Sequence, residues 1–501
     1  MQRQSRLDSR HPFATEVAPT AFVQSLPAHH TAARRGPTLL PALLAFLLIA
    51  WAMAPALACA EPGPRSAGVE PAHGIERALA AARAGDHSLA RAWLDPVLIA
   101  PRLDRATRAR VYHLRGLLFY LDGLYRSAGQ DYRRALEFLP TLAPARGALA
   151  WLHLRGRGVR YDPDRARALY RLAARQGHAE SGFNLALLLM KDAPARPREA
   201  LAWFEAAAAA DHAEAAALAG QLLARGHAGI DPQPSRARAL LQRAADQGHP
   251  GAHLELGMLL EERDPVAARD WYRAAAERGI AAAQSRLGHL LHEGAPGIEP
   301  DPDRALMWFR EAAKQGDARA QSWLGWAYDA GVGVRADPRE ALRWYTRAAR
   351  RDDATAQVNL ARLHESGRGT PRSTEQARYW YEQAAQQGEL NALTGLAWLL
   401  ATAPRAAMRD AERALSLARE AAERDPGPRS LETLAAALAE SGQYAAAVRT
   451  QRRAIGALDA ARAEAEAGPG AAPSVRSRDT RVAASRSRLA SYRAGRPWRA
   501  E

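Results

Sequence analysis

Hydrophobic positions follow two short patterns that alternate along most of the chain. One is a leucine followed by glycine or alanine, and the other is an aromatic pair followed by small side chains. The leucine steps begin at Leu149, Leu185, Leu256, Leu287, Leu324 and Leu360, and the aromatic pairs at Trp203, Trp271, Trp308, Trp344 and Trp380. The last four pairs are 37, 36 and 36 residues apart. This alternation predicts a repeat of about 36 residues that contains two helices.

Glycines and aspartates mark the ends of these predicted helices. Gly331-Val332-Gly333 follows the first helix of one repeat, where glycine accepts the left-handed conformation that ends a helix. Asp337-Pro338 then begins the second helix, with the aspartate as cap and the proline at the first helical position. Because one hairpin cannot bury its apolar face alone, we expect the repeats to stack into a continuous core.

The arrangement of these residues resembles the Sel1-like repeat, a relative of the tetratricopeptide repeat. The resemblance is clearest from Ala320 to Asp353, and we count seven such repeats in residues 143–389. The repeats at 179–212 and 250–280 lack the two-glycine loop, so tighter turns are expected there. The resemblance implies an all-α, right-handed superhelical solenoid of antiparallel helical hairpins that assembles with other proteins.

The segments on either side are more similar to tetratricopeptide repeats. Residues 61–142 and 390–460 carry aromatic and small residues at suitable helical spacings. Residues 461–478 are rich in Ala, Gly, Pro and Glu, which predicts a linker. Residues 479–501 predict a basic C-terminal helix and tail, and such a helix either caps the solenoid or extends freely from it.

The first 60 residues predict a polar leader and an export segment. Arg34-Arg35 precedes a short apolar run, and the small residues that follow predict cleavage after Ala58 or Ala60. An uncleaved membrane anchor at residues 37–60 is the alternative. We therefore expect a periplasmic or secreted protein, or one anchored to the inner membrane by that segment. Cys59 is the only cysteine, which excludes an internal disulfide.

The charge distribution argues against a nucleic-acid partner. The formal net charge is +15, but residues 461–501 alone carry nine arginines against four acidic residues. In the middle of the chain, arginine and acidic residues are mixed along each predicted helix, as on solvated faces. The predicted export from the cytosol also argues against a nucleic-acid partner.

Motifs for catalysis or for cofactor binding are not found. Serine acylation needs Ser-x-x-Lys and Lys-Thr-Gly, and neither Lys191 nor Lys314 fits. His289 and His292, beside Glu293, are the best candidate for a metal site, but a histidine pair without a distant third ligand does not predict one. The sequence therefore predicts no catalytic residue, no metal, no cofactor and no enzyme. The histidines that precede three first helices predict a structural turn role; they are His178, His212 and His249.

Alignment of the repeats with one another indicates where a partner would bind. Core positions repeat their chemistry, whereas positions equivalent to 323 and 326, on another side of the first helix, vary and include large aromatics and arginine. We expect a partner to bind around Arg286, His289, Trp323, Trp326 and Arg362. The alternative is that both tryptophans pack on neighbouring helices.

These expectations together describe an exported, non-enzymatic scaffold or adaptor that binds a protein partner on one face of the solenoid. The alternative function is a cell-wall or glycan-binding module, or a regulator of an envelope enzyme, because aromatic side chains also suit sugar rings.

Overall fold

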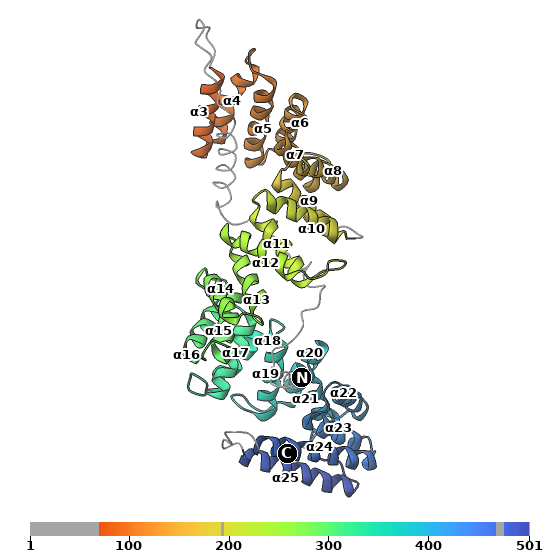
Figure 1. Ribbon diagram of the computed structural model, residues 1–501. Coiled ribbons are helices and arrows are strands. Elements are labelled where there is room, and N and C mark those ends of the chain that lie inside the picture. The colour runs from red at the N-terminus through yellow and green to blue at the C-terminus, as the bar shows by residue number, and fades with distance from the viewer. Residues whose placement is uncertain (1–69, 192–194, 467–474, 500–501) are drawn as a thin grey trace. The chain divides into compact units, whose positions relative to one another are not determined.

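The computed structural model describes residues 70–191, 195–466 and 475–499. These residues form 23 α-helices, α3 to α25, and one short 3-10 turn (Figure 1). The described part of the chain contains no strand, and its two isolated backbone bridges close short turns at His227–Ile230 and Ala295–Ile298. The prediction of an all-α solenoid of helical hairpins is confirmed. The predicted export segment, with Ala58 and Ala60, lies outside the described residues.

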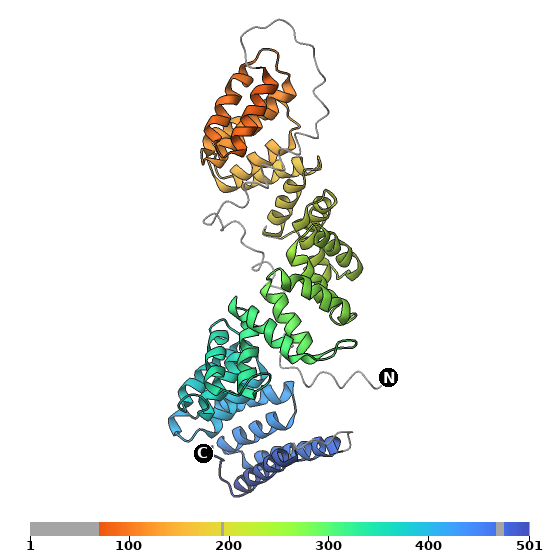
Figure 2. The ribbon, with the colours of Figure 1, turned by 90° about the vertical axis from the view of Figure 1, so that its left-hand side faces the viewer.

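The described chain divides into two units, which meet in sequence at the end of α13. The N-terminal unit comprises residues 70–259. Its helices are α3 (Pro71–Arg83), α4 (His87–Ile99), α5 (Arg105–Leu121), α6 (Tyr125–Phe138), α7 (Ala143–Arg155), α8 (Pro163–Ala174), α9 (Ala179–Lys191), α10 (Pro197–Ala209), α11 (Ala213–Arg225), α12 (Pro234–Asp246) and α13 (Pro250–Leu260). From α3 to α12, each helix packs against the next one (Figure 2).

The C-terminal unit begins at residue 260, and from α14 onward its helices also form stacked hairpins. Its helices are α14 (Pro265–Glu277), α15 (Ala281–Glu293), α16 (Pro302–Lys314), α17 (Ala318–Ala330), α18 (Pro338–Ala349), α19 (Ala354–Ser366), α20 (Thr374–Gln386), α21 (Leu390–Thr402), α22 (Ala411–Arg424), α23 (Pro428–Glu440), α24 (Tyr444–Glu466) and α25 (Val475–Arg493). Within the described residues of this unit, no helix is both long and apolar enough to cross a membrane, and the same holds for the N-terminal unit.

The hairpin of α17 and α18 shows how the sequence specifies one repeat. Gly331 ends α17 in the left-handed conformation, and the Asp337 carboxylate accepts hydrogen bonds from the backbone at the start of α18, both as predicted. Tyr345 on α18 is 1% exposed and its ring lies against Gly325 of α17. A Cβ atom at Gly325 would lie only 2.5 Å from that ring. Glycine in the leucine step therefore lets the two helices approach closely.

The second glycine of two of these loops has a different role, which the sequence pattern alone did not reveal. A Cβ atom at Gly369 would lie 2.3 Å from the carbonyl oxygen of Pro338, at the start of α18 in the preceding repeat. Gly158 approaches the backbone of Tyr125 and Arg126 equally closely, at the start of α6. These loops therefore rest on the second helix of the preceding repeat.

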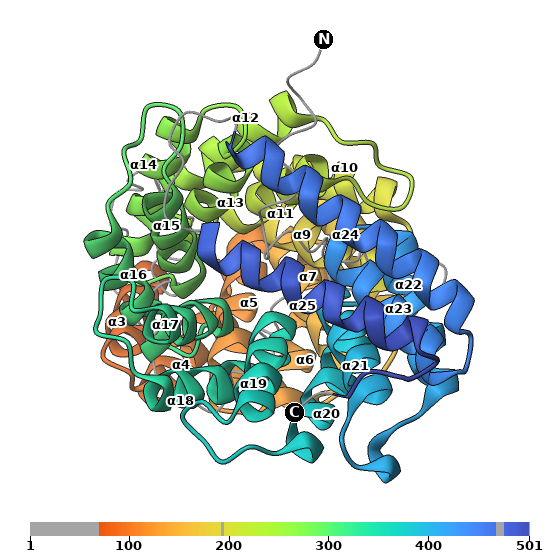
Figure 3. The ribbon, with the colours of Figure 1, turned by 90° about the horizontal axis from the view of Figure 1, so that it is seen from below.

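The C-terminal end differs from the predicted linker and helix. Helix α24 continues to Glu466, and α25 begins at Val475 rather than at residue 479. Alanine, arginine and glutamate are strong helix formers, so the residues after 460 extend α24. Helix α25 packs along α24 (Figure 3) and buries Val482, Leu489 and Tyr492, so it caps the solenoid.

Candidate functional site

Four residues at equivalent positions of successive first helices form one side of the C-terminal unit. They are His289 on α15, Trp326 on α17, Arg362 on α19 and Trp398 on α21, and we call this side the first-helix face. All four are half-buried, whereas the leucines of the leucine steps on these helices, such as Leu287, Leu324 and Leu360, are buried. The neighbouring first helices α17, α19 and α21 contact one another in order. The face therefore presents rings and charges in a continuous row.

Trp323 does not belong to the exposed part of this face. It is 4% exposed and stacks on Phe309 with the ring centres 4.1 Å apart. His292 meets it edge-on at 4.6 Å and also contacts Trp326 at 5.4 Å. The expectation that both tryptophans are available to a partner is therefore wrong for Trp323, because its indole fills the space between α16 and α17. It supports Trp326 from beneath, with the two rings 5.2 Å apart.

Arg286 and His289 both have acidic partners within the C-terminal unit. The Arg286 guanidinium lies 3.0 Å from Glu261, whose carboxylate also accepts a hydrogen bond of 2.6 Å from the hydroxyl of Tyr272. The His289 ring lies 3.5 Å from the Glu293 carboxylate, one turn further along α15. Among the described residues, no group of three or more possible ligands could hold a metal ion. These two residues lie on the predicted face, and each has a carboxylate of the same unit beside it.

The histidines at the starts of first helices have a structural role, as predicted, and the structure shows that they cap those helices. In the N-terminal unit, His212 Nδ1 accepts the backbone N–H of Ala215, and His249 Nδ1 accepts that of Ala252. The other ring nitrogen of His212 lies 3.2 Å from Glu180, in the first turn of the preceding first helix. Each such histidine therefore both caps its own helix and joins it to its neighbour.

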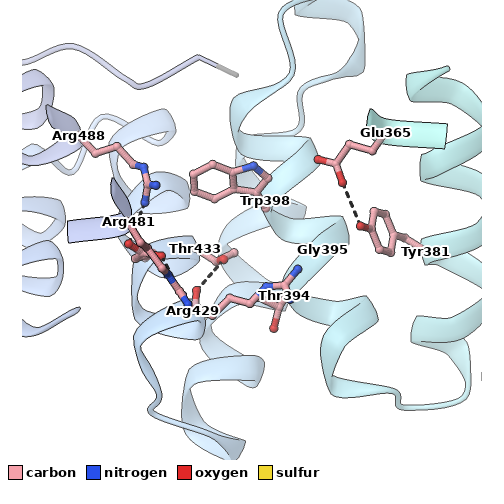
Figure 4. Close-up of a pocket in the computed structure, with 10 residues that line it drawn as sticks. Glu365, Tyr381, Thr394, Gly395, Trp398, Arg429, Thr433, Arg481 and Arg488 are labelled. Carbon is pink, nitrogen blue, oxygen red and sulfur yellow. Dashed lines mark hydrogen bonds and ion pairs between the residues drawn. The ribbon is translucent and has the colours of Figure 1, made fainter. Parts of the chain in front are cut away.

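A pocket that the sequence did not predict lies at the C-terminal end of the first-helix face (Figure 4). Its volume is about 320 Å³. It is lined by Glu365 of α19, Tyr381 of α20, Thr394, Gly395 and Trp398 of α21, Arg429, Glu432 and Thr433 of α23, and Arg481 and Arg488 of α25. Arg481 and Arg488 are seven residues apart and so share one side of a helix, which is the one signal in the sequence that pointed here.

Ion pairs hold α25 against α23 at this pocket. Glu432 is 5% exposed and pairs with Arg488 at 2.9 Å and with Arg481 at 3.3 Å. Two turns later, Glu440 pairs with Arg409 at 2.9 Å and with Arg499 of the C-terminal tail at 2.6 Å. Each of these carboxylates is thus shared by two guanidinium groups, which compensates its burial.

The remaining polar groups of the pocket form hydrogen bonds within the protein. The Tyr381 hydroxyl donates a 3.0 Å hydrogen bond to Glu365, and burial raises the pKa of this tyrosine above its usual value, so it stays protonated. The hydroxyls of Thr394 and Thr433 donate to backbone carbonyls one turn earlier, at 2.9 Å each. The lining residues include no serine, cysteine or histidine. The pocket therefore offers positive charge and an indole edge.

The recurrence of these hairpins matches a known family model. The Sel1 repeat model matches nine stretches, which together cover more than half of the chain: residues 111–139, 143–178, 181–212, 213–249, 251–280, 281–317, 318–353, 354–389 and 392–426. The chain belongs to the Sel1 repeat family. Two of the Sel1 matches, at residues 111–139 and 392–426, fall in the segments expected to be closer to tetratricopeptide repeats.

Solved structures similar to this Sel1 repeat protein come from bacteria and yeast. A Sel1 repeat protein from Oxalobacter formigenes is 25% identical, with 66% of this chain and 95% of that chain covered and a TM-score of 0.48. The protective antigen c5321 of uropathogenic Escherichia coli strains, which displays an SLR fold, is 23% identical, with 80% and 96% covered and a TM-score of 0.42. Yeast Tom70 is 13% identical, with 83% and 96% covered and a TM-score of 0.32. None of the curated proteins matches.

Membership of the family gives a coarse function. Sel1 and tetratricopeptide-like repeat proteins generally mediate protein–protein interaction, and the family is typically a non-enzymatic scaffold.

Proposed function

We propose that this Sel1 repeat protein is an exported, non-enzymatic scaffold or adaptor that binds a protein partner on the first-helix face. The observation that carries the proposal is the row of half-buried Trp326, Arg362 and Trp398 on consecutive first helices. Tryptophan and arginine dominate the energetics of protein interfaces, because both bury large surfaces and retain a polar group.

The last member of this row already contacts another segment of the chain. The Arg488 guanidinium of α25 lies 5.2 Å from the centre of the Trp398 ring. Such a cation–π contact contributes about 0.5–2 kcal/mol, depending on how much water is excluded. The face thus has the chemistry to hold a helix, and similar groups are offered by Arg362 one repeat earlier and by Trp326 two repeats earlier.

Binding through this face is tested with a matched pair of double variants. The first is Trp326→Ala with Arg362→Ala, and the control is Trp344→Ala with Arg347→Ala, a cation–π pair on the second helix α18. Tagged protein is recovered from envelope extracts, and co-purifying proteins are quantified by mass spectrometry. We expect a partner whose recovery falls at least tenfold with the first variant only. Equal recovery with both variants would refute the proposed surface.

Export is the second part of the proposal and rests on the sequence of residues 1–60. The mature N-terminus is expected at Cys59 or Glu61, after cleavage at Ala58 or Ala60. Mass spectrometry of protein purified from the periplasm and from membranes tests this directly. An intact N-terminus in the membrane fraction would support the anchor at residues 37–60, and an intact chain in the cytosol would exclude export.

The alternative function is binding of a cell-wall glycan. The half-buried indoles of Trp326 and Trp398 favour it, because an aromatic face packs well against the apolar side of a sugar ring. Co-sedimentation with purified peptidoglycan separates the two functions. The glycan would be favoured if the unmodified protein sediments with peptidoglycan, Trp326→Ala does not, and the recovery assay finds no protein partner.

A further inference from the structure

The pocket at the end of the first-helix face carries an excess of positive charge. Its lining contains three arginines and two glutamates, which leaves one net positive charge. Arg362 of the first-helix face lies close enough to Arg429 to act on it electrostatically, and it adds a second positive charge. One or two single negative charges are therefore needed to balance this site.

The two glutamates of the pocket are already occupied. Glu432 is paired with Arg481 and Arg488, and its side chain is only 7% exposed. Glu365 accepts the hydroxyl hydrogen of Tyr381 and so faces that ring. Neither carboxylate forms an ion pair with Arg429.

Arg429 is the guanidinium of the pocket that has no counter-ion among the described residues. It lines the pocket near the start of α23, remains exposed, and lies within ion-pair distance of no carboxylate in the described part of the chain. Although Arg429 keeps part of its surface accessible, the surrounding protein displaces water from it and lowers its pKa. The positive charges of Arg362 and Arg481 lower the pKa further, and Tyr381 and Glu365 only partly offset this. An anion placed here would relieve this repulsion, and it would form charge-assisted hydrogen bonds with a planar donor.

We propose that this pocket binds the carboxylate side chains of an acidic segment of the partner protein, with Arg429 as the main contact and Arg362 and Arg481 beside it. This inference rests on the proposed function, since it names the partner's chemistry at one end of the same face. One singly charged carboxylate is sufficient to balance the net positive charge of the lining residues. The Trp398 indole provides an apolar wall for the methylene groups of a glutamate side chain.

Direct binding of peptides to the purified full chain tests the proposal. The probe is a fluorescein-labelled peptide of eight alternating glutamate and glycine residues, measured by fluorescence anisotropy. A peptide with glutamine in place of glutamate is the neutral comparison, and a peptide with phosphoserine in place of glutamate is the dianionic one. We expect the glutamate peptide to bind at least tenfold more tightly than the glutamine peptide and at least as tightly as the phosphoserine peptide, and to weaken as salt screens the charges.

Variants identify the contact within the chain. Arg429→Gln should weaken binding of the glutamate peptide about tenfold, and Arg429→Lys should restore part of it because the charge is kept. The matched control is Arg419→Gln, an exposed arginine of α22 on a second helix, which should leave binding unchanged. Circular dichroism of each variant verifies that the helices are intact.

The outcomes separate this inference from the proposed function. Equal binding of the glutamate and glutamine peptides, tighter binding of the phosphoserine peptide, or no effect of Arg429→Gln would each overturn the acidic-segment site. If peptide binding fails while Trp326→Ala with Arg362→Ala still lowers partner recovery, the first-helix face stands without this pocket. If peptide binding depends on Arg429 while partner recovery is unchanged, the pocket stands and the proposed partner surface fails.

Discussion

Arg488 of the last helix lies over the ring of Trp398, 5.2 Å from its centre, and pairs with the buried carboxylate of Glu432 at 2.9 Å. One side chain thus joins α25 to two first helices, α21 and α23. The Arg488 side chain is only 12% exposed, so little water is available to replace these contacts. The position of the C-terminal helix therefore depends on this arginine.

Arg488→Ala should loosen α25 without unfolding the repeats. The change removes one of two partners of buried Glu432 and costs about 2 kcal/mol of local stability. Hydrogen exchange of the α25 amides should accelerate about 30-fold, since 1.4 kcal/mol corresponds to a factor of ten. Arg486→Ala, an exposed arginine on the same helix, is the control. Equal exchange in both variants would show that the apolar contacts alone hold α25.

Replacement of Trp323 should mainly lower stability, whereas replacement of Trp326 should mainly lower partner binding. Trp323→Ala removes a buried indole that stacks on Phe309, so we expect a loss of about 3–5 kcal/mol, measured by urea unfolding of the C-terminal unit. Trp326→Ala affects a half-buried ring and should cost about 1 kcal/mol, while it lowers partner recovery. A larger stability loss for Trp326→Ala would contradict the assignment of Trp323 as the supporting residue.

Two glycines inside helices should give opposite results when replaced by alanine. A Cβ at Gly325 would lie 2.5 Å from the Tyr345 ring, so Gly325→Ala should destabilise the repeat by about 1–3 kcal/mol through overpacking. A Cβ at Gly456 of α24 meets nothing within 4 Å, so Gly456→Ala should stabilise that helix by about 0.5–1 kcal/mol. Urea midpoints of the two variants measure the difference, and a shift in the same direction would be evidence against close packing at Gly325.

The N-terminal unit should lose stability in mild acid. Burial lowers the pKa of His113 on α5 to about 4, and the neighbouring His178 contributes to the shift. Because the folded-state pKa lies below the unfolded value of about 6.5, the unfolded state binds the proton first. Stability is complete above pH 6.5 and falls as the pH drops towards 4, by about 1–2 kcal/mol between pH 7 and pH 5.

His113→Gln tests that acid sensitivity. The variant cannot take up the proton, so the drop in its urea midpoint between pH 7 and pH 5 should be smaller than that of the unmodified chain. An unchanged drop would assign the acid sensitivity to other groups, such as His153 and His178, whose pKa values are also lowered by burial.

Much of the fold could be predicted because the information is local and repeated. Gly331, Asp337 and Tyr345 each act within one hairpin, and their equivalents recur at a fixed spacing. The pocket could not be predicted in this way. It joins Trp398, Arg429 and Arg488, which lie on three different helices, and only Trp398 belongs to a position that recurs along the chain. Trp323 shows a related limit, because the helical angle placed it beside Trp326 while the space next to Phe309 determined its burial.

The close contact between Gly369 and the carbonyl oxygen of Pro338 determines where such a chain can be shortened or lengthened. A cut between hairpins would separate a loop from the helix that it contacts. A repeat joined at that point would place a different helix surface against the loop. The part that can be exchanged as a module therefore runs from the second helix of one repeat through the following loop. Chimeras joined directly after the two-glycine loop, before the next second helix, should keep this contact, whereas chimeras joined within first helices or at the short turns between hairpins should lose it.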